Sequence, residues 1–341
     1  MNLTAVSSAH WRKTLHQNQL RTNIIIVLFF LMYSGIGLLI DLFLYSATFP
    51  NATFSQLLEA LISFQLFPVA TIILLVIACA SLMISFALYD KLMLLGTTHH
   101  EVTSQTTTLK ERELYHVVEE MKIAGGLRFM PKVYVIEANY MNAFATGYSE
   151  KSALVAITKG LMEKLNREEL QAVMAHELSH IRHLDIKVTL AASLLANMTL
   201  IVIDLLFRTT LFSERRDNRS RQSLLFAITI IRFILPIMSV LLLLYLSRTR
   251  EYMADAGSVE LMRSNTPLAH ALIKIHDDYQ MNRDEYRHDY AITPHENVRR
   301  EAYLFDPVSA GLRSPLFSIG DLFSTHPSIK SRLKAIGFKI I

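Results

Sequence analysis

The string A-H-E-L-S-H at residues 175–180 has the residue types and spacing with the clearest chemical meaning in this chain. His176 and His180 are four residues apart, so in a helix both imidazoles emerge on one face, one turn apart. Such a pair can hold one metal ion, and Zn²⁺ prefers histidine nitrogen and carboxylate oxygen as ligands. Glu177 lies beside that face, where its carboxylate can reach a metal-bound water without being a ligand. The string therefore predicts a zinc site with its own general base.

A catalytic zinc site needs a third protein ligand and leaves its fourth position for water. Cys79 is the sole cysteine and lies in a long apolar run, which excludes it. His183 follows on the same predicted helix but cannot close a tetrahedron from one straight helix, so we expect it at the surface or behind the ligands. Glu251, in the string S-R-T-R-E-Y-M-A-D at residues 247–255, is the better candidate. Asp255 lies one helical turn later and can accept a hydrogen bond from the free N–H of a ligating histidine. Taken alone, these two carboxylates would suit a solvated helix face, and the histidine pair is what favours a metal site.

A small region of mixed α and β structure must position these residues. Residues 110–124 have helical periodicity that ends at a pair of glycines, which is a stop signal for a helix. Asn166, with Glu169 three residues later, resembles a capping box that begins a second helix. That helix runs to about Leu184 and carries the histidine pair. Three short stretches are typical of strands: Lys132–Ile136, Ala143–Tyr148 and Ala153–Thr158. We therefore expect the histidine helix to pack near a short β-sheet.

Four apolar runs are long enough to cross a bilayer, which takes about 20 residues. The runs are Ile24–Tyr45, Phe67–Leu88, Val188–Phe207 and Leu224–Leu246. Of the 341 residues, 51% are hydrophobic and only 19% are charged, which is too apolar for a purely soluble protein and excludes disorder of the bulk. The first run is too long for a signal peptide and lacks a cleavage site, so we expect an uncleaved anchor. These features predict a mainly α integral membrane protein with four hydrophobic helices.

Lysine and arginine residues beside these runs indicate the orientation. Arg12, Lys13 and Arg21 precede the first run, whereas residues 46–66 after it carry neither type. This difference places the N-terminus and the catalytic region in the cytoplasm. Two runs separate the histidine pair from the third ligand, so both can meet on that side. Residues 208–223 are rich in arginine and would make a poor outside loop, so the sequence leaves open whether the second hairpin crosses fully.

The resulting organisation has an arm, two hairpins and two polar regions. These are a cytoplasmic arm at 1–23, a first transmembrane hairpin at 24–88, a catalytic region at 89–187, a second hydrophobic hairpin at 188–246, and a cytoplasmic region at 247–341 that completes the zinc site. Asp204 and Arg232 lie in the second hairpin, where ionisable groups are usually paired, and we expect an ion pair between them. The stretch Gln280–Pro307 has no clear period, so we expect irregular structure there. Basic residues are not interleaved with aromatic ones, so we expect no nucleic-acid partner.

These motifs resemble those of the HtpX-type membrane zinc metalloproteases, which share a peptidase family with the CAAX prenyl endopeptidases. The resemblance spans residues 24–335 in order and includes two further strings, N-A-F-A-T-G at 142–147 and S-T-H-P at 324–327. It implies a zincin-like α+β catalytic domain with one zinc ion per subunit. The zinc ligands would be His176, His180 and Glu251, with Glu177 as catalytic glutamate and Asp255 behind a ligand.

The resemblance also implies how a substrate binds and which partners the protein has. The edge strand that lines the cleft would be Asn142, Ala143, Phe144, Ala145 and Thr146. An extended substrate would add to it as a further strand. His326 becomes the candidate donor to the oxyanion, with Arg332 as a partner of the substrate carbonyl or of the surrounding structure. HtpX-type proteins act in quality control in the bacterial inner membrane, with the active site in the cytoplasm. The implied partners are therefore membrane lipid and unfolded or damaged proteins.

Three alternatives stay open. A non-enzymatic membrane scaffold with a structural zinc would want four protein ligands and no general base. A channel or transporter would want more polar groups near the membrane midplane than four such runs supply. A CAAX-type processing protease would require a prenylated cysteine in its substrate and has about seven spanning helices, so we disfavour it. The sequence predicts no oligomeric state.

Overall fold

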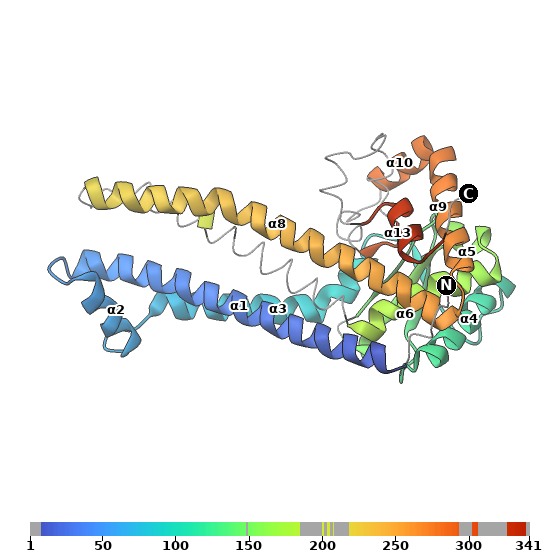
Figure 1. The fold of residues 1–341 in the computed structure, drawn as a ribbon, viewed down its shortest axis with the longest axis horizontal. Helices are drawn as coiled ribbons and strands as arrows, with labels where there is room; N and C mark the ends of the chain where they lie inside the picture. The colour runs from blue at the N-terminus through green and yellow to red at the C-terminus, as the bar shows by residue number, and fades with distance from the viewer. Residues whose placement is uncertain are drawn as a thin grey trace. The chain divides into compact units, whose positions relative to one another are not determined.

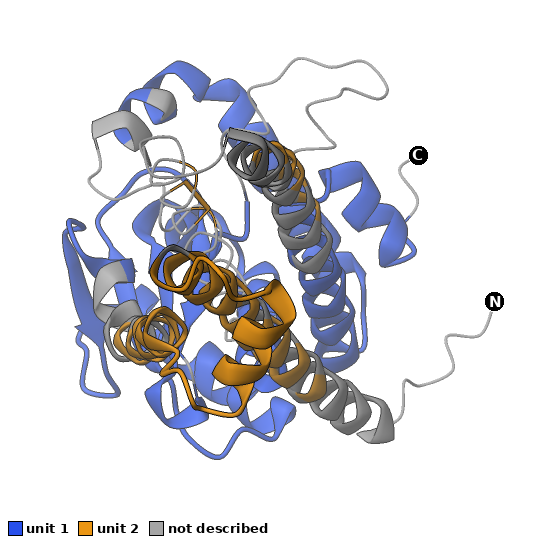
Figure 2. Ribbon diagram, turned by 90° about the vertical axis from the view of Figure 1, so that its left-hand side faces the viewer, with its two compact units in different colours: residues 1–19, 88–189, 244–341 blue, residues 20–87, 190–243 orange. Residues whose placement is uncertain are grey.

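The computed structural model describes residues 8–147, 149–184, 200, 203–204, 207, 218–292, 302–305 and 326–338. The chain forms two compact units, each made of separated stretches (Figure 2). Unit 1 holds residues 1–19, 88–189 and 244–341, and unit 2 holds residues 20–87 and 190–243.

Unit 1 contains a four-stranded mixed sheet in the order β1-β2-β4-β3. The strands are β1 His99–Val102, β2 Lys132–Ile136, β3 Ala143–Thr146 and β4 Leu154–Thr158. β2 and β4 are parallel, whereas β1 pairs with β2 and β3 pairs with β4 in antiparallel fashion. β3 therefore lies at one edge of the sheet. The three predicted strands are confirmed. β1 was not predicted, because its sequence H-H-E-V has no apolar alternation.

Helices pack around this sheet (Figure 1). Those of unit 1 are α4 Leu109–Gly125, α5 Lys159–Lys164, α6 Arg167–His183, α9 Thr266–Met281, α10 Arg283–Ile292 and α13 Ile329–Ala335, with a short 3₁₀ turn η1 at Glu150–Ser152. The predicted capping box begins α6: the Asn166 side chain accepts from the Glu169 N–H at 2.9 Å, and the Glu169 carboxylate accepts from the Asn166 N–H at 3.0 Å. α4 ends at Gly126, which has a φ of 68°, as a glycine stop requires.

The sheet is apolar on both faces. One face, with Val133 and Val155, joins a core built with α4, α6 and α9. The other face, with Ile136 and Phe144, packs against Met93 and a few further apolar side chains. α6 is thus fixed between α4, α9 and β3.

The expectation of irregular structure over Gln280–Pro307 is wrong for residues 283–292, which form α10. Tertiary contacts explain the difference. Tyr286 is buried and its ring packs against that of Tyr279 in a tilted arrangement. Its hydroxyl donates to Asp278 at 2.8 Å and accepts from Lys164 at 2.7 Å. The hydrophobic periodicity of a sequence carries no information about such polar contacts.

Unit 2 is built of helices. These are α1 Ser8–Thr48, α2 Phe54–Ile62, α3 Val69–Leu94 and α8 Asn218–Met262, of which α1, α3 and α8 also extend into unit 1. Asp41, the one charge in the first apolar run, holds the start of α3. Its carboxylate accepts from the N–H groups of Ala70 and Thr71 at 2.8 and 3.0 Å and from the Thr71 hydroxyl at 2.8 Å. The carboxylate satisfies donors that a helix N-terminus otherwise leaves open.

Within the part of the chain that the structure describes, no helix is both long enough and apolar enough to cross a membrane. The four membrane-spanning helices therefore stay a prediction. Most of the third run, Val188–Phe207, and the arginine-rich residues 208–217 lie outside the described residues. The predicted ion pair of the second hairpin is confirmed, with Arg232 Nη2 lying 2.6 Å from Asp204 Oδ1.

Candidate metal centre

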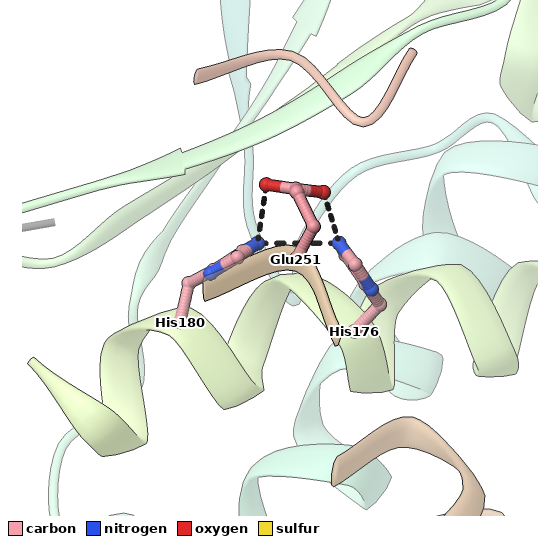
Figure 3. Close-up of side chains that lie close together, drawn as sticks. All are labelled: His176, His180 and Glu251. Atoms are coloured by element: carbon pink, nitrogen blue, oxygen red, sulfur yellow. Dashed lines mark hydrogen bonds and ion pairs between the residues drawn. The ribbon is translucent and has the colours of Figure 1, made fainter. Parts of the chain in front are cut away.

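The three predicted ligands meet in unit 1. His176 and His180 extend from one face of α6, and the Glu251 carboxylate lies between their Nε2 atoms (Figure 3). Glu251 Oε2 is 3.6 Å from His176 Nε2, and Glu251 Oε1 is 3.7 Å from His180 Nε2. One donor atom from each residue falls within 4.8 Å of the others, and all three side chains are buried. A single cation fits among such donors.

α8 brings Glu251 to this place. The helix continues without interruption from the fourth apolar run through Met262, as the sequence indicated. Its Ser258 hydroxyl donates to the Ala172 carbonyl of α6 at 2.7 Å. At Gly257 the two helices approach closely, since a Cβ there would lie only 2.4 Å from Ser179 Oγ. His183, near the same glycine, is not part of the metal-binding group and is buried rather than on the surface.

Asp255 and Arg332 support the first histidine. Asp255 Oδ1 lies 3.0 Å from His176 Nδ1, so Nδ1 carries the hydrogen and Nε2 is left to face the cluster. Arg332 grips the same carboxylate with two nitrogens, Nε at 2.9 Å from Oδ2 and Nη2 at 2.6 Å from Oδ1. Asp255 and Arg332 are fully buried. Burial raises the pKa of Asp255, but the Arg332 charge together with the hydrogen bonds from His176 and Arg332 outweighs burial and holds that pKa below the usual range.

The electrostatics of the cluster without a metal also fit a cation site. Burial lowers the pKa of His176, yet its hydrogen bonds to Asp255 and Glu251 dominate and raise the pKa to about 9. Burial raises the pKa of Glu251, but His326, His176 and His180 outweigh it and hold that pKa well below its usual range. The cluster therefore holds a proton in place of a metal, and metal binding would release it.

Glu177 is completely buried, and neither of its carboxylate oxygens has a hydrogen-bond partner among the residues that the structure describes. Burial raises its pKa, and the charges of His176 and His180 offset only part of that effect. A buried carboxylate without a partner is costly. Such a carboxylate is the expected state of a group that faces a water bound to a metal, so Glu177 also fits a metal site.

His326, the candidate oxyanion donor that the resemblance implies, lies beside the cluster. Its Nδ1 lies 3.6 Å from Glu251 Oε2. Arg332, for which the sequence left two roles, bonds to Asp255 and also donates from Nη1 to the Leu304 carbonyl at 2.7 Å. Arg250, which sequence reasoning missed, is buried and lies 3.4 Å from Glu251 Oε1. Its place directly before the ligand was the only signal.

The predicted edge strand, Asn142–Thr146, corresponds to β3 and the residue before it. Thr158 N donates to the Asn142 carbonyl, and antiparallel pairs alternate, so the backbone groups of Ala143 and Ala145 point away from β4. The Ala143 carbonyl accepts from Leu304 N at 2.8 Å. Tyr303 forms an antiparallel bridge with Phe144, which sets Ala302 opposite the outward backbone groups of Ala145. The chain itself thus occupies one part of the edge, which the sequence did not reveal.

Comparisons with known proteins identify the family of the chain. Residues 108–338 match peptidase family M48. A protease HtpX homolog of Helicobacter pylori (strain Shi470) is 36% identical over 97% of this chain and 99% of its own length. A protease HtpX homolog of Dictyoglomus thermophilum is 35% identical over 65% of this chain and 68% of its own length. Among solved structures, Ste24p of S. mikatae has a TM-score of 0.49 and 17% identity, covering 78% of this chain and 57% of its own.

Proposed function

The chain belongs to peptidase family M48 and is a metallopeptidase, and from this premise we propose that it is a zinc-dependent endopeptidase of the HtpX type. Its substrates are misfolded or damaged membrane proteins, which it cleaves at the cytoplasmic face of a bacterial inner membrane. The single observation that carries the proposal is the convergence of His176, His180 and Glu251 beside a buried carboxylate that has no hydrogen-bond partner in the described part of the chain.

Zinc is the metal that the donor set favours. Two imidazole nitrogens and one carboxylate oxygen are the ligands of a catalytic zinc site that keeps its fourth position open. Asp255, hydrogen-bonded to His176, is the outer partner that such a ligand usually has. When bound there, zinc supplies Lewis acidity, which makes a nucleophile of water near neutral pH and polarises a substrate carbonyl.

The residues of the chain divide the proton chemistry between them. Glu177 takes a proton from the attacking water, because its carboxylate oxygens have no other partner among the described residues and burial raises the pKa of the carboxyl above its usual range. It then passes that proton to the leaving amine. His326 lies next to Glu251 and donates to the oxygen on which negative charge develops. Asp255 and Arg332 keep His176 in one orientation throughout.

The substrate binds in extended form along β3. The outward N–H and carbonyl of Ala145 are the groups that pair with its backbone, in the manner of strand addition to a sheet edge. Because such pairing reads backbone atoms, many sequences can bind.

Membrane attachment is supported by the apolar runs and by the side chains that unit 2 exposes. Leu31, Val76 and Ile237 are 63%, 61% and 61% exposed, on helices that contain three of the four runs. In water such surface is unfavourable, whereas lipid covers it at no cost. The Asp204–Arg232 ion pair has the form expected of charges in an apolar environment.

Metal removal tests the function. The detergent-purified chain is treated with a chelator and resupplied with zinc, and cleavage of casein, an unfolded protein, is measured together with cleavage of a prenylated CAAX peptide. We expect casein cleavage that disappears on chelation and returns with zinc. Cleavage of the prenylated peptide alone would favour the CAAX-type alternative. Tightly bound zinc with no cleavage of either substrate would favour the structural scaffold.

A further inference from the structure

Residues Tyr303–Phe305 lie along the free edge of β3 as a peptide strand would. Tyr303 forms an antiparallel bridge with Phe144. Leu304 N donates to the Ala143 carbonyl at 2.8 Å. The direction and the bonds are those of an extended chain added to the edge. This segment therefore sits where the proposed function places a substrate.

The Asn142 side chain forms a hydrogen bond with each of the two backbone polar groups of Phe305. Its Nδ2 donates to the Phe305 carbonyl at 2.9 Å, and its Oδ1 accepts from Phe305 N at 3.2 Å. The amide group reproduces the pair of bonds that a strand residue would make. It recognises a peptide backbone and is indifferent to the side chain attached to it.

Arg332 places the same segment at the metal centre. Its Nη1 donates to the Leu304 carbonyl at 2.7 Å and lies 3.8 Å from Glu251 Oε2. One guanidinium nitrogen thus lies between a peptide carbonyl and a metal-binding carboxylate. A cation in that position polarises the carbonyl it bonds to.

The side chains of the segment fill apolar sites. Tyr303 packs edge to face on Phe144 at 5.8 Å between ring centroids. Phe305 packs on Tyr279 at 5.4 Å, and Leu304 is buried in the main core. These sites accept leucine and aromatic side chains.

The pairing extends to Ala145. In the antiparallel register of the Tyr303–Phe144 bridge, Ala302 stands opposite Ala145. Because the Ala145 N–H points away from β4, it faces this segment, and a substrate that pairs with Ala145 must displace the segment there as well.

We propose that Tyr303–Phe305 is an internal pseudosubstrate, which occupies the backbone-binding groups of Asn142, Ala143 and Arg332 that an extended peptide with leucine and aromatic residues would otherwise bind. The inference rests on the proposed function and adds to it the subsites and their competitor. A substrate must displace the segment before its own backbone can pair with Ala143. The apparent affinity for substrate is then lowered by the fraction of molecules in which the segment is seated.

Binding of a short peptide tests this without any catalysis. The probe is a fluorescein-labelled synthetic peptide that copies residues 301–307, E-A-Y-L-F-D-P. The protein is the detergent-purified, zinc-loaded full chain with Glu177→Gln, alone or combined with Leu304→Pro or Leu304→Ala. Proline removes the N–H that donates to Ala143. Alanine keeps that N–H and removes the same buried side chain, so the two variants are a matched pair.

We expect the Leu304→Pro protein to bind the probe about fivefold to tenfold more tightly than the parent, as loss of one backbone hydrogen bond from the competitor predicts. Leu304→Ala should fall between them and serves alone where the proline variant does not fold. Hydrogen exchange should show new protection of residues 143–147 on binding. Equal or weaker binding by both variants would overturn the inference and leave Tyr303–Phe305 a structural strand. Casein cleavage by the wild type, measured separately, reports on the proposed function and does not affect this comparison.

Discussion

Gly257 allows α8 to lie directly against α6, and its replacement by alanine should displace the helices that carry the metal centre. A Cβ at this position would lie 2.4 Å from Ser179 Oγ and 2.8 Å from Ser179 Cβ. Rotation of the serine side chain moves Oγ but not Cβ, so the contact cannot be relieved without moving a helix. Asp255 is two residues away on α8, and Ser179 is next to His180 of the metal-binding group. The histidines on α6 and the carboxylates on α8 would therefore move apart.

The magnitude follows from the missing space. Ordinary contact needs 3.4–4 Å, so the backbones must separate by roughly 1 Å, and overpacking of this kind costs about 1–3 kcal/mol. If about 1.4 kcal/mol of that cost falls on metal binding, zinc binds about tenfold more weakly. Zinc affinity is measured by competition with a chromogenic chelator, and stability by thermal unfolding in detergent.

Two further variants make this prediction specific. Gly125→Ala is the same change in α4, where the nearest neighbouring atom to a new Cβ is 3.9 Å away, and it should leave zinc affinity unchanged. Adding Ser179→Gly to Gly257→Ala removes both crowded atoms and should restore part of the zinc affinity. Wild-type zinc affinity in Gly257→Ala, with unfolding like that of Gly125→Ala, would refute the reasoning.

Three other predictions concern the same region. Asp255→Asn should weaken zinc binding about 10–100-fold and lower the free energy of unfolding by about 3–5 kcal/mol, because buried Arg332 loses its charge partner; the exposed Asp277→Asn is the control, and equal zinc affinity in both would count against the assignment. Ala145→Pro should raise KM for casein with zinc content unchanged, because the Ala145 N–H points away from β4 and is the donor that the substrate backbone would lose; unaltered kinetics in a folded variant would contradict the edge-strand hypothesis. The metal-free protein should lose stability as pH rises: the pKa of His176 is raised from 6.5 to about 9 on folding, so its contribution is complete below pH 6.5 and disappears as pH rises through about 9. Thermal unfolding against pH measures this loss, and a flat profile for the metal-free protein would contradict the assigned pKa.

The histidine helix could be predicted from the sequence because its signals are local. The Asn166 cap, its Glu169 partner and the histidine spacing all lie within one stretch of chain, and each has its own physical reason. The meeting of Glu251 with the histidines also followed, since α8 continues without a break from an apolar run into the string that carries the ligand.

Contacts between segments that are distant in the sequence could not be predicted from local patterns. Tyr303–Phe305 joins β3 through a single bridge and a side-chain amide, and neither leaves a periodic signal in the sequence. The apolar tripeptide within the polar stretch Gln280–Pro307 was the one available hint. The sequence showed Asp41 only as a charge in an apolar run, whereas the structure shows that its carboxylate binds the start of α3. Its partners are about 30 residues away, where sequence spacing carries no information on proximity.

The most direct test of the account compares casein cleavage by the wild type, Glu177→Gln and Glu168→Gln at matched zinc content. Both variants replace a carboxylate by an amide on α6, but Glu177 is buried beside the cluster and Glu168 is exposed. The account predicts that Glu177→Gln retains zinc and loses cleavage by at least about 100-fold, while Glu168→Gln cleaves as the wild type does. Undiminished cleavage by zinc-loaded Glu177→Gln would contradict the assignment of the base and, with it, the proposed mechanism.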